Sequence, residues 1–277
     1  MARPPPPPPG TVWDEPIASC PLVFVDLEMT GLDVERDRVI EVCVERVVGT
    51  EVTAKFVSLV NPEIAYSNSD IHGIVPAMTD VAPTFANISQ NVLQILDGAV
   101  FVAHGAQFDV AFLRAECARI GITFERTHYI DTLVLSRRSF ALQGHSLDEL
   151  CKHFGIVRPA AHRAEHDVWA MRKVWDLAIA ELKPESTREL WEVRIGERVA
   201  RSHLIRICEL SLKGNKPITV TYRPRRKPAE HFDFVVTSII SELDPPRVLG
   251  YQLPGRGRRE LRADRVLSVE PAKAGTP

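Results

Sequence analysis

The sequence predicts an α/β protein with a mixed sheet, followed by a small second β domain. Three apolar segments come early in the chain, and helical and strand-like segments alternate after them. That order is typical of a mixed α/β fold. The length of 277 residues suffices for one large domain and a small one. Beyond Pro184 the chain changes to short β segments separated by Pro and Gly, which indicates the second domain.

The first part of the chain is expected to form five strands and five helices. The turn at Gly49-Thr50 predicts that the second and third strands form an antiparallel hairpin or meander. The predicted strands span residues 22–27, 39–48, 54–60, 100–103 and 129–130. The predicted helices span 84–96, 107–120, a short stretch from 132, 146–154 and 164–182. Capping residues at their starts and Gly or Pro at several of their ends support these helices.

Four segments follow from this pattern and from the charge distribution. They are a disordered Pro-rich tail (1–20), a large α/β domain (21–182), a helical linker (183–201) and a basic β domain (202–277). Residues 1–199 hold 19 Lys and Arg against 28 Asp and Glu, whereas residues 200–277 hold 15 against 8. An acidic body suits a metal-dependent site, and a basic C-terminal part suits contact with nucleic acid.

Composition excludes several classes of protein. Hydrophobic residues make up 45% of the chain and charged residues 25%, which is ordinary for a soluble globular protein. No apolar run is long enough to span a bilayer, and the N-terminus lacks the apolar centre of a signal peptide, so we expect a cytoplasmic protein. The five cysteines form no C-x-x-C pair, which indicates neither a zinc site nor a disulfide framework.

Two acids end the first predicted strand. Side chains on a strand alternate between its faces, so Asp26 and Glu28 project the same way. Two carboxylates side by side at the end of a buried strand repel each other and lose hydration. A hard divalent cation between them is the simplest remedy, because carboxylate oxygen suits magnesium and manganese. The alternative, that one acid caps a turn and the other is solvated, becomes weak because further acids follow.

Two more acids and a histidine lie in later elements. Asp109 and Asp167 each fall in the first turn of a predicted helix, and His162 immediately precedes the second of these helices. A helix acid can simply complement the helix dipole, and a loop histidine can simply be solvated. Together, however, four acids and a loop histidine can build a two-metal site for displacement at phosphorus. His162 would take a proton from the attacking water, since imidazole titrates near neutrality.

The spacing of these residues resembles the DnaQ-like 3′-5′ exonucleases of the DEDDh class. Their three motifs match residues 26–31, 104–109 and 162–167, and the likeness covers about residues 20–182. The resemblance implies an RNase H-like fold, a mixed five-stranded sheet flanked by helices. It implies two Mg²⁺ or Mn²⁺ ions, with His162 as the general base. The four ligands would be Asp26, Glu28, Asp109 and Asp167.

The same resemblance implies a seat for the 3′-terminal nucleotide. Its substrate-binding residues would be Thr30, Gly31, Leu32, His104 and Phe108. His104 could instead satisfy the end of the fourth strand. The chain departs from the family pattern at Gly105, where Asn is common, which removes a substrate contact and no metal ligand.

The C-terminal part resembles a WYL-type domain, a small SH3-like β-barrel. The likeness lies in residues 204–212, 218–222 and 258–266, although the Trp-Tyr-Leu signature is absent. It implies a nucleic-acid or nucleotide ligand, and arginine suits phosphate contacts. The candidate nucleic-acid grip is Arg223, Arg225, Arg226, Arg256, Arg258, Arg259 and Arg262. A basic solubilising surface is an equally good interpretation of these residues.

Three functions remain open from the sequence. The first is a metal-dependent 3′-5′ exonuclease acting on single-stranded DNA, together with a separate polymerase or repair partner. The second keeps the chemistry but changes the substrate to RNA or short oligoribonucleotides. The third is a nucleic-acid or nucleotide sensor that regulates through the WYL-like domain. The presence of all five catalytic positions favours an enzyme.

Overall fold

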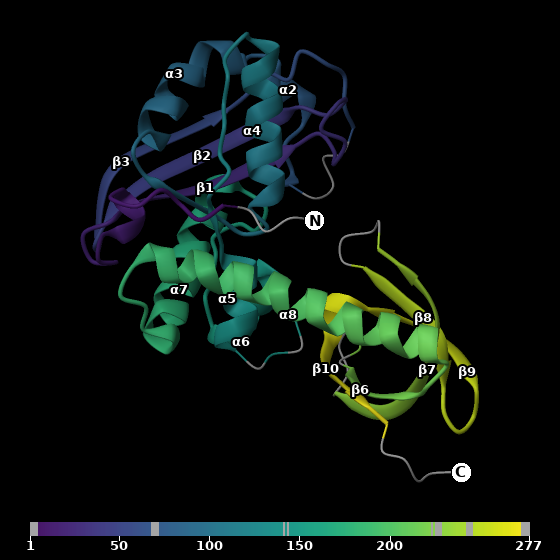
Figure 1. Ribbon diagram of the computed structural model, residues 1–277. Helices are drawn as coiled ribbons and strands as arrows, with labels where there is room; N and C mark the ends of the chain where they lie inside the picture. Colours follow the sequence, from purple (N-terminus) through teal and green to yellow (C-terminus); the bar gives the residue numbers. More distant parts are fainter. Residues whose placement is uncertain are drawn as a thin grey trace. The chain divides into compact units, whose positions relative to one another are not determined.

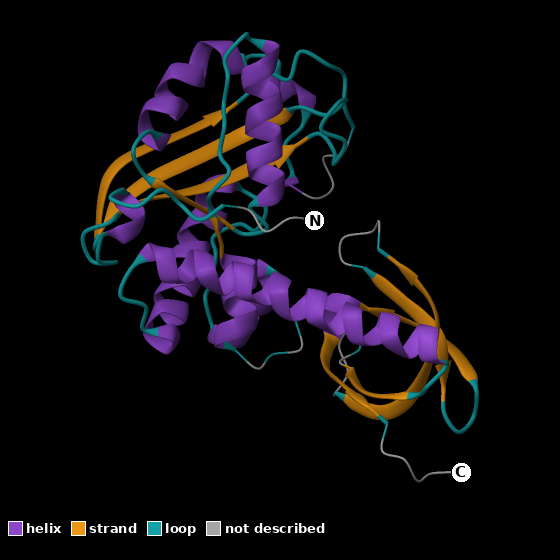
Figure 2. Cartoon of the chain, in the orientation of Figure 1, coloured by secondary structure: helices purple, strands orange, loops and turns teal. Residues whose placement is uncertain are grey.

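The computed structural model describes residues 5–67, 72–140, 142, 144–222, 224, 229–241 and 246–272 (Figures 1 and 2). Within these ranges, the side chains of residues 192–203 and 264 are left out of the description. The chain divides into two compact units, residues 1–194 and residues 195–277. None of the described helices combines the length and apolar character needed to cross a membrane.

A mixed five-stranded sheet forms the centre of the first unit. Its strands are β1 (Pro21–Met29), β2 (Val39–Val48), β3 (Glu51–Leu59), β4 (Val100–Ala103) and β5 (Ile130–Asp131). They lie in the order β3-β2-β1-β4-β5. β1 pairs antiparallel with β2, and β2 pairs antiparallel with β3, so the chain reverses twice. It then crosses over, because β4 pairs parallel with β1. The predicted mixed sheet is confirmed, and it places the end of β1 next to the start of the segment after β4.

Helices cover both faces of this sheet (Figure 1). On one face lie α3 (Phe85–Leu96) and α4 (Gln107–Arg119). On the other lies α7 (Ala164–Leu182), which contacts β1 and β2 and also packs on α5 (Thr132–Ser139) and α6 (Leu147–Phe154). The short helix η1 (Val12–Asp14) precedes β1, and α2 (Pro76–Thr79) lies between β3 and α3.

The core follows from the apolar, β-branched sequence of β1. Val23 and Val25 are fully buried in the cluster that α3 and α4 complete. Phe24 points to the other face, where its ring meets that of Trp175 on α7 at 5.6 Å between centroids. A strand buried on both faces reads as a continuous apolar run, and β1 does so until the acids begin.

Residues 5–20 of the tail that we expected to be disordered make specific contacts, whereas residues 1–4 lie outside the described residues. Arg188 donates to the carbonyl oxygens of Pro7 and Pro8 at 2.7 and 3.0 Å, and Trp13 of η1 is 7% exposed. Proline lacks an N–H group but keeps its carbonyl, so a guanidinium can hold a proline run. Composition alone does not reveal such a partner 180 residues away in the sequence.

The second unit is an antiparallel β domain that follows one long helix. The segment 183–201, expected to be a helical linker, lies largely within a longer helix, α8 (Thr187–Gly214). The strands are β6 (Ile218–Tyr222), β7 (Glu230–Ile240), β8 (Arg247–Gln252), β9 (Gly257–Arg262) and β10 (Val266–Pro271). Their order is β10-β6-β7-β8-β9. No ladder joins β9 to β10 among the described strands, so the closed SH3-like barrel that we expected is not seen.

Candidate active site

Two acids lie near the end of β1, and the strand is regular up to the second of them. Asp26 lies opposite Cys43 of β2 and Glu28 lies opposite Glu41, with the register shifting only after Glu28. The two side chains therefore project from the same face of the strand, as strand alternation predicts.

Asp109 reaches the site from the first turn of α4, which begins shortly after β4. Its side chain is buried, with 6% of its surface exposed. Gly105, in the turn before the helix, has φ +84° and donates its N–H to Asp131 Oδ1 at 2.9 Å. A left-handed residue is needed there, which glycine supplies without strain.

His162 and Asp167 come from the start of α7. Asp167 lies in the first turn of the helix and is 6% exposed. His162 lies just before it, in the loop between α6 and α7, with φ +57°, and 40% of its side chain is exposed. The imidazole is therefore accessible to solvent while it lies beside the acids.

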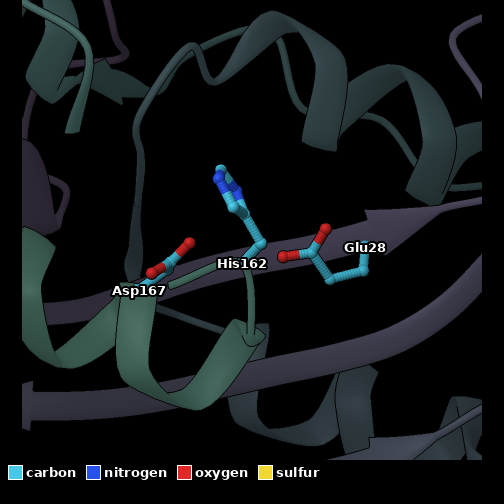
Figure 3. Close-up of side chains that lie close together, drawn as sticks. All are labelled: Glu28, His162 and Asp167. Carbon is cyan, nitrogen blue, oxygen red and sulfur yellow. The ribbon is translucent and has the colours of Figure 1, made fainter. Parts of the chain in front are cut away.

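The structure brings side chains from β1, the α6–α7 loop and α7 to one place. Ligand atoms of Glu28, His162 and Asp167 lie within 4.8 Å of one another, close enough to hold a metal ion (Figure 3). The two carboxylates point toward a common space beside the histidine. Oxygen and imidazole nitrogen are donors that divalent ions such as manganese accept.

Electrostatics connects Asp26 and Asp109 to the same group. Burial raises the pKa of Asp26 well above its usual value, and the charges of Asp109, Glu28 and Asp167 raise it further. Burial, then Asp167 and Glu41, raise the pKa of Glu28 to about 8. Burial raises the pKa of Asp109 to about 8, with a contribution from Asp131. Such like-charged carboxylates fit a divalent cation, whose charge would offset their repulsion.

Glu41 and Arg163 are residues that sequence reasoning missed. Arg163 donates from Nε and Nη2 to Glu41 Oε1 at 3.0 and 2.6 Å, and Ala164 N donates to Oε2 at 2.9 Å. Glu41 is 2% exposed on β2, so it ties the start of α7 to the sheet and thereby places His162 and Asp167. An acid inside the apolar run of residues 39–48 was the available signal.

Arg158 and Asp148 were also missed. Arg158 lies in the loop before His162, and its Nη1 donates to Asp167 Oδ1 at 2.5 Å. Its Nη2 donates to Asp148 of α6. Asp148 Oδ2 in turn lies 3.7 Å from His162 Nε2. Nothing in the sequence pattern distinguished this arginine from an ordinary loop residue.

The residues after β1 are organised around Asp37. Thr30 is 3% exposed, and its hydroxyl donates to Asp37 Oδ1 at 2.9 Å. A Cβ at Gly31 would lie 2.4 Å from Asp37 Oδ2, so only glycine allows this carboxylate to approach. Leu32 follows with 74% of its surface exposed, and Phe108 is 43% exposed. Exposed apolar side chains beside a polar site are suited to contact a base.

His104 is occupied inside the fold. Its Nε2 lies 3.0 Å from the carbonyl oxygen of His145, and its Nδ1 lies 3.0 Å from the Thr132 hydroxyl. A carbonyl only accepts, so Nε2 carries the proton and Nδ1 is the acceptor. Burial lowers the pKa of His104 to about 4. The histidine therefore joins β4, α5 and the loop before α6, and both of its ring nitrogens have partners within the fold.

The candidate arginines of the second unit differ from one another. Arg223, Arg225 and Arg226 lie outside the described residues. Arg256 and Arg258 are exposed. Arg259 instead donates to Glu230 at 2.8 Å and stacks on Phe232 at 4.5 Å, which is an intramolecular role. Arg262 is partly buried.

The sequence of the first unit matches a known family. The family described as "Exonuclease" (RNase_T) matches residues 23–174, which is more than half of the chain. The chain belongs to the exonuclease family. The enzyme class predicted from the motifs, a 3′-5′ exonuclease, is confirmed at the level of this domain, as is the likeness to DnaQ-like proteins. This match ends at residue 174, so the resemblance of the C-terminal part to a WYL-type domain stays a prediction.

Curated relatives share the domain within much longer proteins. "DNA polymerase III PolC-type" of Caldanaerobacter subterraneus is 31% identical over 174 residues, which is 62% of this chain and 12% of the relative. "DNA polymerase III subunit epsilon-like protein" of Rhodobacter capsulatus is 35% identical over 61% of this chain and 25% of its own length. "3′-5′ exonuclease DinG" of Bacillus subtilis is 30% identical over 52% of this chain and 16% of its own. The chain thus spans a quarter or less of each of these three relatives.

Solved structures share the fold. E. coli exonuclease I in complex with a dA16 oligonucleotide has a TM-score of 0.56 at 14% identity, covering 91% of this chain and 65% of that one. The nuclease domain of 3′hExo, described as a DEDDh family member bound to rAMP, has a TM-score of 0.51 at 16% identity. It covers 60% of this chain and 94% of that one. The sheet of the first unit fits the RNase H-like exonuclease fold.

Proposed function

We propose that the first unit is a divalent-metal-dependent exonuclease that removes nucleotides from the 3′ end of single-stranded DNA. Asp26, Glu28, Asp109 and Asp167 would hold two Mg²⁺ or Mn²⁺ ions, and His162 would act as the general base. The observation that carries the proposal is the convergence of these four acids, from three separate elements, around one half-exposed histidine.

The raised pKa values support the metal part of the proposal. Carboxylates that lie close together away from water are costly to ionise, because they lose hydration and repel one another. A nearby positive charge would offset this cost. A pair of divalent ions would stabilise the attacking and leaving oxygens of an in-line displacement. The zinc-bound form of E. coli exonuclease I with single-stranded DNA shows that one protein of this fold binds a divalent ion.

The chain's own residues would then do three things. His162 takes the proton of the attacking water, and the carboxylate of Asp148, 3.7 Å away, stabilises the imidazolium that results. Glu41 holds Arg163 and the N–H of Ala164, which keeps His162 at the edge of the acid group. Leu32 and Phe108 present exposed apolar surface for the terminal base.

DNA is the proposed substrate because two of the three relatives carry DNA polymerase names. By analogy, the protein would act with a polymerase or a repair partner. RNA is the second candidate, since the 3′hExo nuclease domain was solved with rAMP bound. The second unit would bind the nucleic-acid backbone through two exposed arginines, Arg256 in the β8–β9 turn and Arg258 near the start of β9. The same proposal includes the resemblance of the second unit to a WYL-type domain, which implies a nucleic-acid or nucleotide ligand.

A digest of end-labelled strands tests the proposal. The full chain is incubated with Mn²⁺ and 5′-labelled DNA as single strand, duplex or mismatched duplex, beside matched RNA. We expect a ladder of shortened 5′-labelled products, fastest for single-stranded DNA, that disappears with chelator and in D26N. Release of the 5′ label first, or trimming that persists without divalent ions, would contradict the proposal.

A further inference from the structure

Arg158 makes a direct ion pair with the acid cluster. The cluster is defined here as Asp26, Glu28, Asp109 and Asp167. Among the described residues, Arg158 is the one cation with an ion pair to a member of it, through Asp167 Oδ1 at 2.5 Å. Its side chain is 7% exposed, so it lies within the site and is not a surface residue that reaches over it. One guanidinium charge cannot balance four acids.

Arg158 also has a second carboxylate available outside the cluster. Its Nη2 donates to Asp148 Oδ1, on the first turn of α6, and the side chain of Asp148 is 54% exposed. A guanidinium has several donors in a planar fork, so one group can bridge two carboxylates. Arg158 can therefore release Asp167 and still keep a charged partner at the rim of the site.

The position of Arg158 conflicts with an ion on Asp167. A divalent ion coordinated by Asp167 would lie only a few ångströms from the guanidinium, and like charges at that distance repel strongly. The same guanidinium lowers the pKa of Asp167 against the effect of burial, so it already supplies part of the compensation that an ion would bring. Arg158 and a metal ion thus compete for the negative charge of the Asp167 carboxylate.

We propose that Arg158 is a resident counter-ion of the acid cluster, which must withdraw from Asp167 to Asp148 when a divalent ion binds. Arg158 acts as a positioning residue, because its contact with Asp167 raises the concentration of divalent ion at which the site fills. This inference rests on the proposed function, because it assumes that the cluster binds metal. It concerns the free protein, so nucleic acid is not required to test it.

The test is a titration of the full chain with Mn²⁺ followed by electron paramagnetic resonance, which counts free Mn²⁺ without any reaction. R158Q keeps a polar side chain of similar reach but removes the charge, and we expect about tenfold tighter Mn²⁺ binding, the size of one charge-assisted contact. R158K keeps the charge and should bind close to wild type. R138Q removes the same charge from an exposed arginine of α5 and should leave affinity unchanged.

Equal or weaker Mn²⁺ binding by R158Q would overturn the inference, because Arg158 would then orient Asp167 for the ion. Tighter binding by R138Q as well would also overturn it, since net charge alone would be responsible. Circular dichroism of each variant checks folding, and R158K keeps the comparison valid if R158Q is unstable. Wild-type binding that is lost in D26N supports the metal site independently, so the proposed function can stand while the role of Arg158 fails. If wild type binds no Mn²⁺, both fail.

Discussion

Buried and half-buried carboxylates in the first unit fall into two groups with opposite surroundings. In the first group every acid has a cationic partner. Glu41 pairs with Arg163, and Glu116 pairs with Arg38. Glu45 pairs with both Lys55 and Arg172. The acid cluster has Arg158 alone, among the described residues. The fold therefore supplies a counter-charge where an acid only joins elements. At the end of β1, Arg158 is the one cation paired with the acid cluster among the described residues, which fits the proposal that divalent ions bind there.

The largest expected effect is on activity, from removing one charge of the cluster. D26N should lower kcat/KM by roughly a thousandfold or more, because the proposed mechanism uses Asp26 as a metal ligand. Its unfolding free energy should be unchanged or higher, since the substitution removes charge repulsion. Steady-state kinetics and urea unfolding of the same preparation measure both. A large loss of stability would place Asp26 in the paired group.

Removing the charge of a paired acid should lower the stability of the fold. Glu116 is 1% exposed, accepts from Arg38 Nε at 2.8 Å and from Val39 N at 3.1 Å, and joins β2 to α4. E116Q should lower the unfolding free energy by about 3 kcal/mol, because it leaves Arg38 without its full partner. Urea unfolding checks this, with R138Q as a surface control. An unaffected stability would break the distinction between the two groups.

The two groups also predict a pH dependence. In the metal-free protein, Glu28 and Asp109 have pKa values of about 8, whereas in the unfolded chain they titrate near 4.5 and 3.8. The folded state therefore holds more protons between pH 4 and 8, so stability should fall as pH rises through this window, by at most about 1.4 kcal/mol per pH unit and carboxyl. Unfolding at several pH values with chelator measures the slope. A flat or rising profile would contradict the raised pKa values.

Phe108 should matter to substrate binding more than to chemistry. F108A should raise KM about tenfold with a smaller effect on kcat, because stacking on a base is lost. L210A, at an exposed leucine of α8, is the control. An unchanged KM would mean that the exposed ring does not contact the terminal nucleotide.

The smallest expected effect concerns the second unit. The double change R256Q/R258Q should weaken binding of single-stranded DNA roughly three- to tenfold and reduce its salt dependence by about two counter-ions. Fluorescence anisotropy at several salt concentrations measures both. The change R259Q is the comparison, since Arg259 is engaged with Glu230 and Phe232 and should affect stability more than binding. Identical salt slopes would favour the alternative of a solubilising surface.

Local pattern predicted the parts of the fold and site that depend on near neighbours. Strand alternation placed Asp26 and Glu28 on one face, and helix starts placed Asp109 and Asp167 in first turns. The clamp between Glu41 and Arg163 joins residues 122 apart, and the tail contact from Arg188 to Pro7 joins residues 181 apart. Such pairs depend on tertiary packing, which no local pattern contains. The internal partners of His104 were hidden for the same reason.

The most direct test of the central claim is anomalous diffraction from a crystal of the full chain soaked with Mn²⁺. The account predicts two peaks roughly 4 Å apart, coordinated by Asp26, Glu28, Asp109 and Asp167. It also predicts no peak at the paired acids Glu41, Glu45 and Glu116. A cluster without peaks at saturating Mn²⁺, or ions bound at the paired acids instead, would contradict it.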